Sequence, residues 1–203
     1  MKTSIIPYLK LSTTLLIIIL SLTFSNAYTY ASKLDTAEEL VTHISNEILF
    51  LATKNTDLSS KQKSLEVLFN NFADVNTIAR AALGKSWRNL DEKSKRNFID
   101  AFQKYIAKKY SSQFKEFTGA KMKIEKSIDY ERRGVLVKTR LIMSGSSPIS
   151  VNWQLWSRDG SLKLIDIIIE GISMLTIERE EIKNRLNKLD GNTLALIQDL
   201  KNY

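Results

Sequence analysis

The 203-residue sequence contains no cysteine and a single histidine, His43. Without cysteine the chain cannot form a disulfide, a thiolate zinc site, an iron–sulfur cluster or a cysteine nucleophile, and it cannot be lipidated on a cysteine. One histidine excludes the two-histidine HExxH zinc site, and it allows a Ser-His-Asp triad only if His43 is the base. The sequence therefore predicts no catalytic site, no metal site and no cofactor.

Glycine and proline are also scarce, with seven and two residues, and 43% of the chain is hydrophobic. This composition is typical of a globular protein and not of a disordered or collagen-like chain. The 30 lysine and arginine residues exceed the 22 acidic residues, which gives a formal net charge of +8. A basic chain favours anionic partners, which can be nucleic acid, lipid head groups or acidic protein surfaces.

The first 27 residues have the parts of a signal peptide. Two lysines precede an uncharged run from Leu11 to Phe24, and Ser25-Asn26-Ala27 provides a small-x-small cleavage site. The strongly apolar part is shorter than the roughly 20 residues that a membrane-spanning helix needs, which argues against an uncleaved anchor. The sequence predicts cleavage after Ala27, or after Ala31, export to the periplasm, and one mature domain over residues 28–203. Export favours lipid head groups or acidic proteins over nucleic acid as partners.

The first half of the mature chain has the periodicity of amphipathic helices. From Asp35 to about Leu51 the apolar residues recur three and four apart, and Thr36 and Glu39 form a capping box. Serine and aspartate at the later helix starts are favoured N-cap residues. The further helices are expected to start at Ser59 or Ser60, to run from Asp74 to Gly84, and to run from Asp91 to Gly119.

After Gly119 the periodicity changes from about 3.6 to about 2, which is typical of strands with one buried face. Three alternating runs follow, separated by turn sequences, and a fourth run is apolar on both faces apart from Asp166, which favours a central strand or one under the helices. Two helical stretches close the chain. The expected strands cover residues 122–130, 135–143, 149–155 and 162–169, and the closing helices run from Ser173 to Leu186 and from Thr193 to Leu200. The predicted fold is α+β, with helices wrapped over one face of a curved, about four-stranded antiparallel sheet.

The apolar inner face of this sheet is expected to meet the aromatic stripe of the long helix. Two interpretations stay open, an ordinary packed core and a cavity between the layers that holds an apolar ligand, because periodicity does not separate a filled interior from a lined pocket. The candidate lining residues are Phe102, Tyr105 and Ile106 on the helix and Val135, Val137, Leu141, Met143, Val151, Trp153, Leu155, Ile167 and Ile169 on the strands.

Two acidic residues, Asp166 and Glu170, stand four apart in an otherwise apolar strand sequence. Buried carboxylates need partners, so the sequence favours a structural ion pair in which Arg80, or Arg88, neutralises these two acids. The functional alternative is a general base in an apolar pocket, as in ketosteroid isomerases, whose cone-shaped fold is similar.

The remaining polar candidates are expected to be structural. His43 lies at the apolar edge of its helix and is expected to be a half-buried structural residue. Seven basic residues on the outer strand face and its turns are expected to be a solvated face that protects the sheet edge, and the alternative is docking of an acidic partner or anionic head groups. These residues are Lys121, Lys123, Lys126, Arg132, Arg133, Lys138 and Arg140.

Two separated blocks of the sequence have a recognisable pattern. The first contains Phe72-Ala73-Asp74-Val75, Ile78-Ala79-Arg80 and Leu83-Gly84-Lys85-Ser86-Trp87-Arg88. The second contains Asp166, Glu170-Gly171 and Ser173, and Val137-Lys138-Thr139 and Pro148-Ile149-Ser150-Val151 lie between the blocks. In this order, behind a signal peptide, they resemble the MlaC family of periplasmic phospholipid carriers, also called toluene-tolerance auxiliary proteins. The resemblance covers about residues 40–200, with one departure at Ser161-Leu162, where the family usually has an aromatic residue.

The resemblance implies a helical layer over a strongly curved sheet, with a deep apolar pocket for the acyl chains of a phospholipid. It also implies a carrier without catalysis. The carrier would move phospholipid between an outer-membrane lipoprotein and porin complex and an inner-membrane ABC transporter complex with its periplasmic lipid-binding subunit, which maintains outer-membrane lipid asymmetry. Two acyl chains are expected to need a pocket at or above the upper end of the roughly 300–1,000 Å³ that is usual for ligands. The alternatives are a small periplasmic enzyme with Asp166 as general base and a ligand-free periplasmic adaptor.

Overall fold

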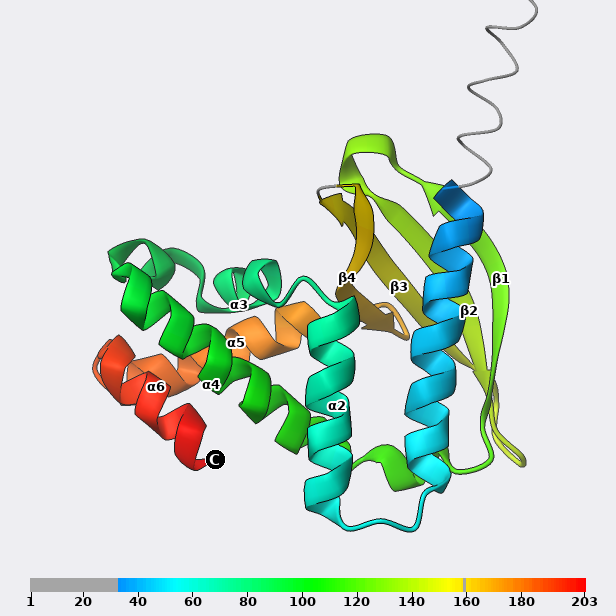
Figure 1. Cartoon of the computed structure of the whole chain (residues 1–203), viewed down its shortest axis with the longest axis horizontal. Helices are drawn as coiled ribbons and strands as arrows, with labels where there is room; N and C mark the ends of the chain where they lie inside the picture. Colours follow the sequence, from blue (N-terminus) through cyan, green and yellow to red (C-terminus); the bar gives the residue numbers. More distant parts are fainter. Residues whose placement is uncertain (1–32, 159) are drawn as a thin grey trace, which may run out of the picture.

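An open antiparallel sheet, in which each strand pairs with its neighbour along the chain, forms one layer of the molecule (Figure 1). The computed structural model describes residues 33–158 and 160–203. The strands are β1 (Lys121–Asp129), β2 (Val135–Ile142), β3 (Ile149–Arg158), β4 (Ser161–Ile169) and β5 (Ile172–Ser173). The fold is α+β as predicted, but the sheet has five strands and not four. The sequence did not reveal β5 because its two residues are too few to show an alternating pattern.

Helices supply the second layer, and three short 3₁₀ turns lie in the connections, between α3 and α4, between α4 and β1, and between β1 and β2. The first helix covers residues 33–53 of the described chain. The other α-helices are α2 (Leu58–Phe72), α3 (Val75–Leu83), α4 (Glu92–Ser111), α5 (Met174–Lys188) and α6 (Thr193–Asn202). The 3₁₀ turns are η1 (Gly84–Asn89), η2 (Phe114–Phe117) and η3 (Glu131–Arg133).

Side-chain caps fix where most of these helices begin. Asp74 and Asp91 cap α3 and α4 as predicted, because each carboxylate accepts a hydrogen bond from the N–H three residues later. The prediction for the start of α2 is wrong by two or three residues. Its cap is Asp57 rather than Ser59 or Ser60, since the Asp57 carboxylate accepts from both the N–H and the hydroxyl of Ser60.

The long helix α4 ends at Ser111, eight residues before the expected stop at Gly119. At its end the hydroxyl of Ser111 donates to the Lys108 carbonyl at 3.0 Å, and the hydroxyl of Ser112 donates to the Lys109 carbonyl at 3.0 Å. The chain then passes through a turn into η2, so the residues beyond Ser111 do not continue the long helix.

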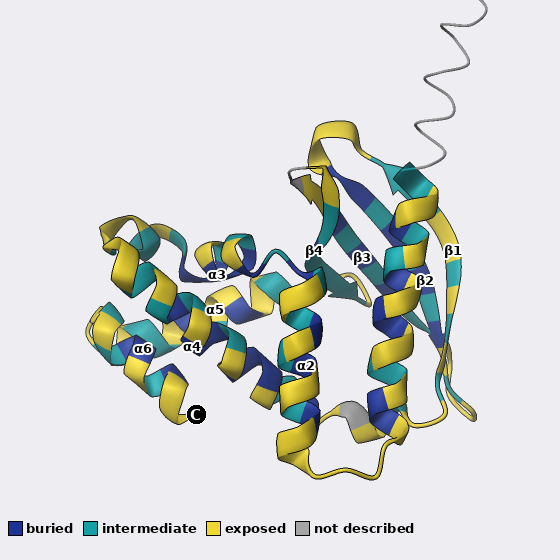
Figure 2. Cartoon of the chain, in the orientation of Figure 1, coloured by how far each residue is buried: buried dark blue, intermediate teal, exposed yellow. Residues whose placement is uncertain are grey.

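The helices divide into two groups around the sheet. The helix 33–53 and α2 stand side by side before the sheet, whereas α3, α4, α5 and α6 pack together beside it (Figure 1). Figure 2 shows that these helices turn buried residues inward and exposed residues outward. The expectation that the full aromatic stripe of α4 covers the sheet is therefore wrong, because only the second half of α4 reaches the space before the strands.

Contacts at two edges of the sheet hold the first two helices in place. Lys33 of the helix 33–53 forms an ion pair with Asp129 at the end of β1, at 2.8 Å. Ala73, directly after α2, forms a parallel bridge with Leu164 of β4. The two helices are thus attached to opposite sides of the sheet, and a space is left between them and the strands.

Two sequence predictions concern the N-terminal segment. The signal peptide over residues 1–27 and both cleavage positions lie outside the described residues. Within residues 33–158 and 160–203, none of the helices combines the length and the apolar character needed to cross a membrane.

Candidate functional site

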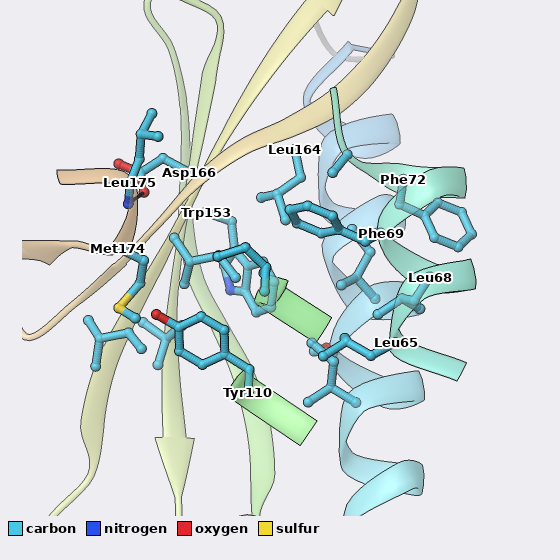
Figure 3. Close-up of a pocket in the computed structure, with 18 of the residues that line it drawn as sticks. Leu65, Leu68, Phe69, Phe72, Tyr110, Trp153, Leu164, Asp166, Met174 and Leu175 are labelled. Atoms are coloured by element: carbon cyan, nitrogen blue, oxygen red, sulfur yellow. Dashed lines mark hydrogen bonds between the residues drawn. The ribbon is translucent and has the colours of Figure 1, made fainter. Parts of the chain in front are cut away.

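A largely apolar cavity of about 290 Å³ lies between the helices and the sheet. Figure 3 shows α2 on one side of it, with Leu65 and Phe69 directed inward, and Leu68 and Phe72 of the same helix also belong to the wall. Residues from the helix 33–53, α4, the strands and the start of α5 complete the wall. The interior is therefore not filled by a packed core, and the interpretation of a lined pocket is the one that the structure favours.

Seven of the twelve candidate lining residues lie in the cavity wall. They are Phe102, Ile106, Leu141, Val151, Trp153, Ile167 and Ile169. The α4 residues belong to its second half, and the strand residues lie on the inner faces of β2, β3 and β4. Periodicity identified the correct sheet face and the correct helix face.

The other five candidates, which are Tyr105, Val135, Val137, Met143 and Leu155, lie outside the cavity wall. Val135 pairs with Leu155, and both are fully buried among packed side chains at the start of β2. Tyr105 packs its ring against Tyr203 at 4.7 Å, on the side of α4 that faces α6. Met143 follows the end of β2. Strand alternation marks a buried face, but it does not show which part of that face meets packed atoms and which part meets a void.

The sequence analysis missed the walls that the helix 33–53 and α2 supply. Ile44 and Ile48 line the cavity from the first helix, and Leu65 and Leu68 line it from α2. Their spacing of three and four residues was visible as amphipathic stripes. The sequence analysis did not predict that these stripes pack against the sheet, because it expected the aromatic stripe of α4 to cover the sheet.

The expected ion pair of Arg80 with Asp166 and Glu170 is not formed in the described part of the chain. Arg80 is exposed, and Asp166 instead accepts hydrogen bonds from the Ser173 hydroxyl at 2.6 Å and the Leu175 N–H at 2.9 Å. The Glu170 carboxylate accepts the N–H of Ser150. Asp166 thus fixes the N-terminus of α5 against β4, which satisfies the carboxylate with neutral donors rather than with a cation.

A second polar cluster, which the sequence analysis did not single out, joins α4 to α5 at the cavity wall. Glu178 is 4% exposed and lines the cavity. Its Oε1 accepts from the ammonium of Lys109 at 2.8 Å and from the hydroxyl of Tyr110 at 2.5 Å. Burial, together with the hydrogen bond and charge of Glu178, raises the pKa of Tyr110 far above its usual value. Burial alone would lower the pKa of Lys109, but its bond to Glu178 and the charge of that carboxylate outweigh burial and raise it.

The remaining candidates lie at the surface. His43 is exposed, and its ring meets the Phe72 ring edge-on at 4.9 Å, so its expected half-burial is wrong. On the outer sheet face, Lys123 lies opposite Arg140 and Lys126 lies opposite Lys138. Like charges directly opposite each other repel, and an anionic partner bound to this face would relieve the repulsion. Docking of such a partner on the basic face stays a prediction. The described residues contain no group of acidic residues and histidine that could hold a metal ion.

The cavity is smaller than expected for two acyl chains. An apolar cavity of about 150 Å³ is large enough for one benzene molecule, so about 290 Å³ accommodates on the order of a dozen carbon atoms. This is far less than the hydrocarbon of a diacyl lipid. In this conformation the cavity is therefore too small to hold both acyl chains of such a lipid, and it is called the contracted cavity below.

Comparisons with known proteins agree with this geometry. The model of the family described as MlaC protein matches residues 35–202, whereas a search of curated proteins finds no match. Among solved structures the chain is similar to a phospholipid-binding protein from Ralstonia solanacearum in complex with a phospholipid. The likeness has a TM-score of 0.67 and 16% sequence identity, and it covers 81% of this chain and 94% of that chain. At this identity the likeness establishes the fold, and the family match extends over most of the sequence. The chain belongs to the MlaC family.

Proposed function

We propose that this protein is a periplasmic phospholipid carrier. The observation that carries the proposal is the apolar cavity, which is enclosed by helices on one side and by the sheet on the other. Family membership and the phospholipid in the similar Ralstonia protein support the same cargo. Asp166 and Glu178 are the acidic residues of the wall, and both accept hydrogen bonds from neighbouring groups of the chain.

A carrier is needed because acyl chains do not cross water unaided. Each methylene that leaves an apolar environment costs about 0.8 kcal/mol, so two long chains resist transfer into water by on the order of 20 kcal/mol. A cavity lined by leucine, isoleucine and phenylalanine replaces the bilayer during transit. The head group can stay at the opening, where it keeps contact with water.

The proposed route follows from the family and from the signal peptide. The carrier would accept phospholipid from one membrane complex and deliver it to another, with an outer-membrane lipoprotein and porin complex at one end and an inner-membrane ABC transporter complex at the other. The basic outer sheet face is a candidate surface for docking an acidic partner. Transport between these complexes would preserve the lipid asymmetry of the outer membrane.

The alternative of an enzyme with Asp166 as general base is less well supported by the geometry. Both oxygens of this carboxylate already accept hydrogen bonds, from Ser173 and from Leu175. These two donors hold the start of α5 against β4, which gives the carboxylate a structural role in the fold. We infer that Asp166 is a structural residue.

Native mass spectrometry of the mature chain, purified in mild detergent and then transferred to volatile buffer, tests the proposal. We expect a complex whose added mass equals one diacyl phospholipid, and lipid-free protein should recover that mass after incubation with phospholipid vesicles. A folded protein that carries no lipid in either experiment contradicts the proposal. A filled interior in a lipid-free crystal structure would then point to the ligand-free adaptor.

A further inference from the structure

One oxygen of Glu178 lacks a partner although it is buried. Oε1 accepts from Lys109 and Tyr110, but Oε2 has no hydrogen-bond partner among the described residues. A buried acceptor without a donor costs free energy, and an ionised one costs more than a neutral one. Native proteins leave few such groups, so this oxygen calls for a physical reason.

The position of Glu178 connects it to the ligand site. The residue contributes to the cavity wall next to Tyr110, whose hydroxyl points toward Met174 at the start of α5 (Figure 3). Gln113, three residues after Tyr110, also lines the cavity and is exposed to solvent. Lys109, on the other side of the carboxylate, is partly exposed as well. The unpaired oxygen is itself buried, but the wall close to it reaches solvent at Gln113, where the polar end of a cargo would sit.

The contracted size of the cavity explains how this oxygen becomes accessible. A diacyl lipid needs more space than about 290 Å³, so its entry has to move the wall elements apart. Separation of the helix 33–53 from α2 would widen the cavity and give a head group access to Oε2, while Oε1 keeps Lys109 and Tyr110 because α4 and α5 stay together. An acceptor in this position selects a group that brings a donor with it.

Resting on the carrier function proposed above, we infer that Glu178 Oε2 binds a hydrogen-bond donor in the head group of the cargo, so that the protein selects phospholipids with N–H or O–H donors over phosphatidylcholine, which has none. The two sources of such a donor are the primary ammonium of phosphatidylethanolamine and the hydroxyls of phosphatidylglycerol. Both satisfy the carboxylate by a charge-assisted hydrogen bond.

The wild-type protein can be tested with a series of lipids that differ only in their donors. Phosphatidylethanolamine, its N-methyl and N,N-dimethyl derivatives and phosphatidylcholine keep the head-group charge and the acyl chains constant while the N–H groups are removed one by one. Competition from mixed vesicles, read by native mass spectrometry, should show occupancy falling by about tenfold over the series, the effect expected for one hydrogen bond to a charged group. Equal occupancy of all four lipids overturns the inference. Phosphatidylglycerol with the same chains, competed against phosphatidylcholine, shows whether a hydroxyl serves as well as an ammonium.

A substitution assigns the selectivity to one residue. Glu178→Gln keeps the size of the side chain and an oxygen for Lys109 and Tyr110, but it places an amide N–H where Oε2 accepted. We expect the series to become flat in this variant. The matched control, Glu180→Gln, changes an exposed carboxylate on the same helix and should leave the series unchanged. Selectivity that persists in Glu178→Gln overturns the inference.

The design separates this inference from the carrier proposal. If the folded wild-type protein binds none of the lipids, the carrier function itself is wrong. If it binds all of them equally, the carrier function stands and the assignment to Glu178 fails. Should Glu178→Gln not fold, as circular dichroism would show, the wild-type series alone decides between these outcomes.

Discussion

Trp153 is a large side chain that belongs both to the core and to the cavity wall. It is 2% exposed, and its indole Nε1 donates to Thr139 Oγ1 at 3.1 Å. The hydroxyl of Thr139 in turn donates to the Val151 carbonyl on the neighbouring strand. This chain of donors holds the indole plane in one orientation between β2 and β3.

Replacing Thr139 by valine keeps the shape of the side chain but removes this acceptor. The indole N–H is then buried without a partner, and we expect the free energy of unfolding to fall by about 1–3 kcal/mol in urea titrations. Thr42→Val, at an exposed threonine of the helix 33–53, serves as the control and should change stability by no more than about 0.5 kcal/mol. Equal effects of the two substitutions would show that the indole does not depend on Thr139.

Gly134 illustrates a residue whose lack of a side chain is required by its surroundings. Its φ angle is 84°, and a Cβ at this position would lie 2.0 Å from the Leu155 carbonyl oxygen. Gly145 has a similar φ of 76°, but nothing lies within 4 Å of the position that a Cβ would take. Gly145→Ala therefore isolates the backbone strain, about 1–3 kcal/mol, whereas Gly134→Ala adds a clash with the neighbouring strand. We expect thermal unfolding to show the larger loss for Gly134→Ala, and an equal loss would contradict the close approach.

At the scale of the element, α4 has two functionally different halves. Ala101 is fully buried in packed core, whereas Ala107 is buried but lines the cavity. Leucine at position 101 has no space, and overpacking should lower the free energy of unfolding by about 1–3 kcal/mol. Leucine at position 107 extends into the void instead. We expect Ala107→Leu to change stability little and to reduce lipid occupancy in native mass spectra, and a large loss of stability would show that no usable void exists there.

The sequence predicted elements better than their assembly. Caps such as Asp74 and Asp91 are local signals, so the starts of α3 and α4 follow from a few neighbouring residues. The early end of α4 has no comparable local signal, since a serine that bonds the preceding turn as Ser111 does, Ser64, also stands inside α2. Which helices cover the sheet depends on contacts between distant segments. The cavity walls of the helix 33–53 and α2 were therefore missed although their apolar stripes were visible.

The same limit applies to the polar residues of the site. Asp166 was recognised as an unusual acid in an apolar strand, but its partners, Ser173 and the Leu175 N–H, lie beyond a turn that reverses the chain. Glu178 looked like one of several acidic residues on a helix, and only the packing of α5 against β4 and the bonds of Glu178 to Lys109 and Tyr110 reveal that it is buried. Burial of a charged residue results from tertiary packing, and its sequence neighbours carry no signal for it.

At the scale of the whole molecule, the contracted cavity has to open before a diacyl lipid can enter. The helix 33–53 is attached to β1, through the Lys33–Asp129 ion pair and a hydrogen bond of 2.6 Å from Ser127 to Glu38. In contrast, α2 is attached to β4 and packs against α4. A groove separates the two helices on the outside, and its wall shares Leu68 and Phe72 with the cavity. Separation along this seam opens the cavity without breaking either attachment.

Because the chain contains no cysteine, the seam can be closed with a specific cross-link. Glu47 on the first helix and Lys63 on α2 are both exposed and line the outer groove. We expect the double variant Glu47→Cys, Lys63→Cys to stop taking up lipid from vesicles once a short bismaleimide joins the two helices, and to take it up normally before the reaction.

The control, Glu38→Cys with Ser127→Cys, cross-links the helix 33–53 to the strand that it already contacts. If the seam is the entrance, this second cross-link leaves uptake intact. If the second cross-link blocks uptake and the first does not, the seam is not the entrance. The opening would then lie between the helix 33–53 and β1, and the helix 33–53 and α2 would move together away from the sheet.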